Sequence, residues 1–130
     1  MGFISDLQVN EEGAKRRRAD FLVLYHLREN GPSSQAELEQ GVKSIADSLV
    51  RFKRDPPVQF SQSSGSNGIY SRELNEAIDR CLHYDRIERT ADNRYQLTDR
   101  GEEYLQNPDR LEGHGINADF QDVVASRTTL

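Results

Sequence analysis

The segment "GIYSRELNEAIDRCLHYDRIERTADNRYQLTDRG", residues 68–101, carries the signals that decide the fold. Ser71 is a residue type favoured at a helix N-cap, and Glu73 follows in the first turn, where the helix dipole favours a carboxylate. The next apolar positions recur at helical spacing and are Leu74, Ala77, Ile78, Cys81 and Leu82. This pattern predicts a helix over residues 71–84 with one buried face.

Two short strands are expected directly after this helix. Residues 86–90 and residues 94–98 alternate polar and apolar side chains, and an Ala-Asp-Asn turn lies between them. Alternation on both sides of an Asp-Asn turn predicts an antiparallel β-hairpin. Asp99 and Glu102 then have the spacing that caps a further short helix.

Two more helices are expected before this segment. Residues 14–30 suit a largely buried helix because their second half is mainly apolar. Ser34 and Glu37 have the spacing of a capping box, and apolar residues then recur at steps of four and three as far as Phe52. Gly41 interrupts this second pattern, so one long helix and two short helices both remain open.

The chain length of 130 residues is that of one domain. We expect a flexible lead-in over residues 1–13 and the domain itself over residues 14–106. A loop insertion is expected near residues 55–69, with a short strand possible at 58–60. Residues 107–130 form a tail, which is either disordered or a short amphipathic helix. The apolar residues that would line this helix are Ile116, Phe120, Val123 and Val124.

The formal net charge is −5, and the second half of the chain carries all of it. Residues 1–70 hold nine basic and nine acidic side chains, whereas residues 71–130 hold eight basic and thirteen acidic ones. An acidic chain argues modestly against nonspecific DNA binding, which depends on a local excess of Lys and Arg. The single Cys81 and the lack of a long apolar stretch predict a cytoplasmic protein that does not span a membrane.

No pattern of catalytic or metal-ligating residues stands out. His26, His83 and His114 lie far apart in the sequence and lack metal-ligand spacing. The Gly- and Ser-rich residues 61–68 lack the Lys-Ser/Thr ending of a phosphate-binding loop. We therefore expect no enzyme activity, no cofactor and no bound metal, and we expect Cys81 to be a small buried residue.

Three helices followed by a hairpin is the order of a winged helix-turn-helix domain. The sequence therefore predicts an α+β fold of this type, with three or four helices and a two-stranded β-hairpin wing. The stretch "IERTADNRYQLTDRGEEYL", residues 87–105, resembles the wing and following helix of prokaryotic regulators of the MarR and PadR kind. Residues 52–101 also resemble the Panacea antitoxin-associated domain. That second resemblance is carried by Tyr70, Ser71, Glu73, Leu74, Ile78 and Leu82.

The resemblance implies sequence-specific binding of double-stranded DNA by a transcriptional regulator, and we expect a homodimer. The helix over residues 71–84 would enter the major groove, where Arg pairs with guanine and Asn with adenine. The wing and the basic residues before the first helix would contact phosphates or the flanking groove. The residues expected to contact DNA are Lys15, Arg16, Arg17, Arg18, Ser71, Arg72, Asn75, Arg80, Asn93 and Arg94.

An interaction adaptor, or an antitoxin-like partner binder with the same fold, is the alternative. Glu73, Glu76 and Asp79 lie on the expected recognition helix, where carboxylates would repel phosphates. A negatively charged outward face on this helix would therefore favour a protein partner. The apolar stripe of the tail would then dock on a second copy or on another chain.

Overall fold

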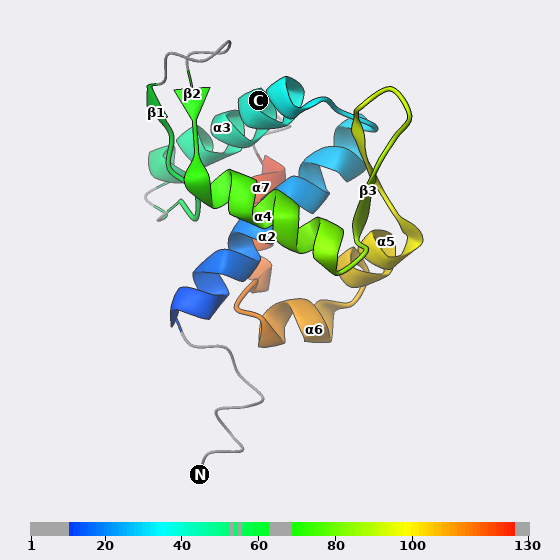
Figure 1. Cartoon of the computed structure of the whole chain (residues 1–130). Coiled ribbons are helices and arrows are strands. Elements are labelled where there is room, and N and C mark those ends of the chain that lie inside the picture. Colours follow the sequence, from blue (N-terminus) through cyan, green and yellow to red (C-terminus); the bar gives the residue numbers. More distant parts are fainter. Residues whose placement is uncertain (1–10, 53, 55, 63–68, 127–130) are drawn as a thin grey trace.

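The computed structural model describes residues 11–52, 54, 56–62 and 69–126. It is rich in helix and contains two-stranded antiparallel sheets, which confirms the α+β class (Figure 1). The helices are α2 (Glu11–Asn30), α3 (Gln35–Arg51), α4 (Arg72–His83), α5 (Asp99–Leu105), α6 (Pro108–Gly113) and α7 (Ala118–Ser126). The strands are β1 (Ser61–Gln62), β2 (Ile69–Tyr70), β3 (Ile87–Arg89) and β4 (Tyr95–Leu97).

Helix α2 is the central element of the fold. Every residue from Ala19 to Leu27 is buried, so this part of the helix has no solvent-exposed side. Helices α3, α4 and α5 and strand β4 pack around it, and α4 crosses it in Figure 1. A helix that is apolar around most of its circumference needs such cover on several faces.

Helix α3 is one continuous helix, which settles the alternative raised by Gly41. The Ser34 hydroxyl accepts a hydrogen bond from the backbone N–H of Glu37, and the Glu37 carboxylate accepts one from the N–H of Ser34, so the predicted capping box is confirmed. A β-carbon at position 41 would overlap the ring of His26 on α2. Glycine is therefore present because α2 and α3 approach closely there.

Replacing Gly41 with alanine should destabilise the protein. Alanine favours a helix interior by about 1 kcal/mol over glycine. Here, however, the added methyl group would displace the buried His26 ring, which is bonded to the hydroxyl of Ser33 at 3.1 Å. We expect the free energy of unfolding to fall by about 1–3 kcal/mol in chemical denaturation.

The matched control is Gly113→Ala in α6, where a β-carbon would meet no atom within 4 Å. This variant should be neutral or slightly more stable than the parent. Equal effects of the two substitutions would contradict the close approach of α2 and α3.

Strands β3 and β4 form the expected hairpin, with Ile87 opposite Leu97. Each strand is shorter by one residue at both ends than the sequence predicts, although the bond from Thr98 N–H to Arg86 O extends the backbone pairing. Ser33, between α2 and α3, forms an isolated antiparallel bridge with Tyr95. The segment around Ser33 thus pairs with the outer edge of β4, beside the hairpin.

The insertion between α3 and α4 differs from the prediction. The short strand that the sequence left possible at residues 58–60 is not formed. Val58 packs into the core, and the two prolines before it lack the N–H groups that a ladder needs. Strands β1 and β2 pair instead, and β2 leads directly into α4. Residues 63–68 lie outside the described residues, as do residues 1–10 of the expected lead-in; α2 already begins at Glu11.

The hydrophobic core continues into the segment expected to be a tail. Helices α6 and α7 and the turn between them bring four buried apolar side chains to it, and the ring of Phe120 lies 6.0 Å from that of Phe21 on α2. Gly115, with a φ of +85°, makes the turn between the two helices. Its carbonyl accepts a hydrogen bond of 3.1 Å from Arg18. The four buried residues are Leu111, Ile116, Phe120 and Val124.

Candidate functional site

The N-terminus of α4 is held by Ser71, which sequence analysis placed among the DNA contacts. Ser71 is 2% exposed. Its hydroxyl accepts a hydrogen bond of 3.1 Å from the N–H of Leu74. It also donates one of 3.3 Å to Glu73. Ser71 therefore caps the helix and presents little surface to any partner.

The solvent-facing side of α4 carries more acid than base. We define the outward face of α4 as Arg72, Glu73, Glu76, Asp79 and His83, of which all but the half-buried Glu73 are exposed. The guanidinium of Arg72 lies 4.0 Å from the carboxylate of Glu76. Three carboxylates thus face solvent with one arginine, and that arginine is paired with one of them.

Arg80, expected to meet a DNA phosphate, is bound inside the protein. Its Nε and Nη2 lie 3.0 and 2.9 Å from the Asp20 carboxylate on α2. Nη2 also donates a hydrogen bond of 3.2 Å to the carbonyl of Arg16. Asp20 is fully buried. Burial raises the pKa of Asp20, and the hydrogen bond from Arg80 and the charges of the nearby arginines oppose that rise.

The four basic residues at the start of α2 do not act as one patch. Arg17 points towards the buried Asp20, with its Nη1 at 3.8 Å from the carboxylate. Arg18 contacts the carbonyl of Gly115. Arg16 remains exposed, paired with Glu12 at 3.4 Å, and Lys15 is half-buried.

The structure brings four of the predicted residues to one cleft between α2 and α4. This cleft, of about 340 Å³, is lined by Lys15, Arg16, Arg72 and Arg80. Three carboxylates also line the cleft and offset the positive charge of these four residues. One of the four, Arg80, is already bound to Asp20. The three acids are Glu12, Glu73 and Glu76.

The predicted wing residues lie near the start of α3. Arg94 Nη1 is 2.7 Å from the carboxylate of Glu37. Asn93 sits at the turn with a φ of +64°, and its side-chain oxygen accepts a hydrogen bond of 3.2 Å from Arg89. Asn75 on α4 accepts one of 2.9 Å from Gln35 on α3. Seven of the ten candidate residues therefore form two groups, four at the α2–α4 cleft and three around the wing and α3.

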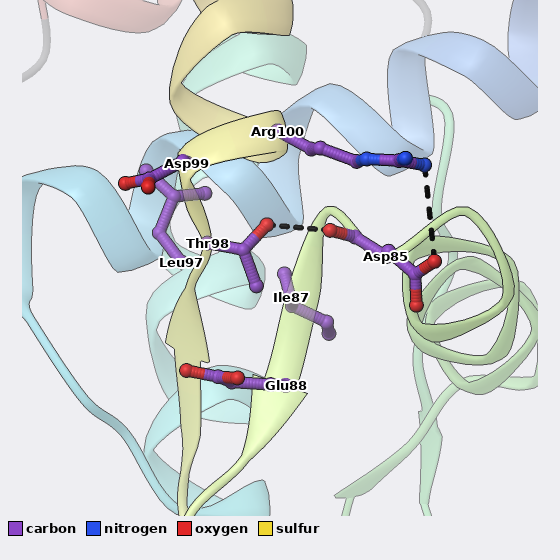
Figure 2. Close-up of a pocket in the computed structure, with 7 residues that line it drawn as sticks. All are labelled: Asp85, Ile87, Glu88, Leu97, Thr98, Asp99 and Arg100. Atoms are coloured by element: carbon purple, nitrogen blue, oxygen red, sulfur yellow. Dashed lines mark hydrogen bonds and ion pairs between the residues drawn. The ribbon is translucent and has the colours of Figure 1, made fainter.

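A second cleft, of about 520 Å³, lies at the base of the wing (Figure 2). Figure 2 shows the Thr98 hydroxyl bonded to the backbone carbonyl of Asp85, and Arg100 reaching the Asp85 carboxylate, at 3.8 Å. Ile87 and Leu97 contribute apolar surface. Three carboxylates and one guanidinium line this cleft, so it is acidic like the outward face of α4. The carboxylates are those of Asp85, Glu88 and Asp99.

Sequence analysis missed the roles of two charged residues. Asp20 is a single carboxylate between apolar neighbours and is buried. A carboxylate in such a position is rarely buried without a cationic partner, so its place in the sequence could have indicated the pair. Arg86, the first residue of the strand expected at residues 86–90, is 9% exposed. Its guanidinium lies against the rings of Tyr84 and Tyr104, and no local pattern in the sequence indicates this.

Within residues 11–126, as far as the structure describes them, no three His, Cys, Asp or Glu side chains are grouped so that they could hold a metal ion. None of the described helices is both long and apolar enough to cross a membrane. Cys81 is buried as expected, and burial raises the pKa of its thiol. Comparison of the chain with protein-family models, with curated proteins and with solved structures finds no match.

Proposed function

We propose that the chain is a winged-helix module that binds a protein partner through the outward face of α4 and the neighbouring wing. The order of α2, α3, α4 and the β3–β4 hairpin supports the winged-helix assignment. The bridge between Ser33 and Tyr95 supports it further, because it sets the segment between the first two helices beside the wing.

The acidic outward face of α4 is the reason to propose a protein partner instead of DNA. Glu76 and Asp79 are exposed, whereas Arg80 is engaged by Asp20. Affinity for DNA comes largely from cations that neutralise phosphates, and carboxylates in the same position oppose it. A basic protein surface complements this face instead, and such complementarity supports both association rate and specificity.

Binding of double-stranded DNA, as a homodimeric transcriptional regulator, is the second candidate. Lys15, Arg16 and Arg72 line the same cleft, and this arrangement favours it. Arg89 and Asn93 are exposed on the wing, where an arginine can reach a minor groove or a phosphate. In this case the residues of α4 and of the wing would contact neighbouring parts of one duplex.

Charge reversal on α4 separates the two candidates. Fluorescence anisotropy with mixed-sequence duplexes would measure DNA binding between about 50 and 200 mM salt. The parent protein should show no salt-dependent affinity for DNA over this range. The double variant Glu76→Lys/Asp79→Lys should gain affinity of about tenfold or more, because two repulsive groups become phosphate contacts. Salt-dependent binding by the parent protein would establish DNA as the partner and refute the protein-binding proposal.

The matched control is Glu103→Lys/Asp109→Lys, which makes the same charge change at exposed positions on α5 and α6. A short peptide of alternating arginine and valine serves as the basic probe. It should bind the parent protein and the control, and lose affinity for the α4 variant. Equal loss in both variants would point to net charge alone.

A further inference from the structure

Among the described residues, no carboxylate lies within ion-pair distance of Arg86, a buried arginine at the start of the wing, although the charge of Asp20 acts on it from further away. The guanidinium carbon of Arg86 lies 3.9 Å from the ring centroid of Tyr104 and 5.0 Å from that of Tyr84. Its Nη1 atom is buried and has no hydrogen-bond partner among the described residues. Aromatic faces attract a cation, but they do not replace the hydrogen bonds that a buried guanidinium loses.

Arg17 brings a second guanidinium to the same tyrosine. Its guanidinium carbon is 5.4 Å from the ring centroid of Tyr84, and its Nη1 is also buried without a hydrogen-bond partner in the described part of the chain. Asp20 lies 3.8 Å from this atom and is already bound by Arg80 at 2.9 Å. One carboxylate therefore serves both Arg17 and Arg80.

Three other titratable groups nearby supply no negative charge. Burial, and then the charges of Arg17 and Arg86, lower the pKa of His114, so its ring is neutral near pH 7. Burial raises the pKa of Tyr104 to about 12 and also raises that of Cys81. The guanidinium carbons of Arg17 and Arg86 both lie within 5.4 Å of the Tyr84 ring centroid, so the two arginines share one neighbourhood.

We propose that Arg17 and Arg86 bind a small oxyanion, of the size of phosphate, beside the ring of Tyr84. The N–H groups of a guanidinium match the oxygens of such an ion. Tyr84 is 41% exposed, so the site borders on solvent. The site adjoins the end of the outward face of α4, because the ring of His83 lies 5.2 Å from that of Tyr84, but its existence does not depend on the partner proposed for that face.

Glu102 on α5 offers the competing explanation. Its Oε2 is buried and has no hydrogen-bond partner within the described residues. A change of rotamer that paired Glu102 with Arg86 would satisfy both groups and leave no need for an anion. The experiment must therefore distinguish an external anion from this internal pair.

Sodium phosphate should be titrated into the full chain at constant pH and ionic strength, with the arginine Nε–Hε resonances followed by NMR. The resonances of Arg17 and Arg86 should move together with a saturating dependence. At a phosphate concentration ten times the dissociation constant, the Tm should rise by about 4 °C.

Arg17→Gln, at the less buried of the two positions, should lose both responses. Arg110→Gln is the matched control, because Arg110 is exposed and near His114, and it should keep both. Absence of a phosphate response in the parent protein would overturn the proposal, and a lower Tm in Glu102→Gln would then identify the internal pair. An equal Tm rise in Arg17→Gln would also overturn it, since that result indicates general salt stabilisation.

Discussion

Replacing Asp20 with alanine should lower the free energy of unfolding by about 3–5 kcal/mol. The Asp20 carboxylate is fully buried and holds Arg80 at 3.0 and 2.9 Å, across the interface between α2 and α4. Its removal would leave Arg80 half-buried without its partner, and Arg17 would lose its nearest carboxylate. Urea denaturation followed by circular dichroism would measure the loss.

Two further variants test the physical cause of this loss. The double variant Asp20→Leu/Arg80→Met replaces the buried pair with apolar groups and should recover most of the lost stability. Asp79→Ala removes an exposed carboxylate from α4, the helix that carries Arg80, and should change stability by less than about 0.5 kcal/mol. A loss below about 1 kcal/mol in Asp20→Ala would show that the buried pair is unimportant.

The direction of the Asp20 pKa shift explains why the pair need not add stability. Burial raises this pKa above its usual value of 3.8, despite the opposing effects of Arg80 and Arg17. The folded state thus holds the Asp20 proton more tightly than the unfolded state. The resulting contribution to stability is fully present below pH 3.8 and declines as the pH rises through the folded pKa. The ionised pair therefore orients α4 on α2 more than it stabilises the fold.

Local patterns in the sequence predicted the helical and hairpin elements well. The face of α4 expected to be buried is buried at Leu74, Ala77, Ile78 and Cys81. The hairpin forms around the expected turn, where Asn93 adopts a positive φ that asparagine tolerates. These features depend on residues close together in the chain, which is why spacing alone revealed them.

The contacts that shape the candidate site come from distant segments, and spacing does not reveal them. Arg80 and Asp20 lie 60 positions apart. The periodicity of α4 places Arg80 near the edge of the exposed face, but it cannot show that a carboxylate on α2 lies within bonding distance of Arg80. Arg86 likewise alternates correctly for a wing surface, but its guanidinium lies against the rings of Tyr84, at the end of α4, and Tyr104, on α5.

The sequence of residues 107–130 also did not show which part of the molecule covers the apolar stripe. An apolar stripe indicates a buried helical face but not the surface that covers it. Val123, a member of the predicted stripe, is only partly buried, whereas Leu111 lies outside that stripe and is 1% exposed. The tail's apolar residues join the core of their own chain, around α2 and α3.

Replacing Ile116 with alanine should lower the free energy of unfolding by about 2–5 kcal/mol. Ile116 is 0% exposed and lies between α6 and α7, so the smaller side chain would leave a cavity in the core. Glu112→Ala, at an exposed position in the same segment, is the matched control and should change stability by less than about 0.5 kcal/mol. Thermal and urea denaturation would compare the two variants.

Deleting residues 108–130 should have a larger effect still, because it uncovers the side of α2 on which Phe120 packs. The shortened chain should lose its cooperative unfolding transition and associate nonspecifically through the exposed apolar surface. If the tail served instead to join two copies, the deletion would leave a folded monomer with a sharp transition. Light scattering, combined with the denaturation curve, distinguishes these results, and a stable monomer would remove α6 and α7 from the folding unit.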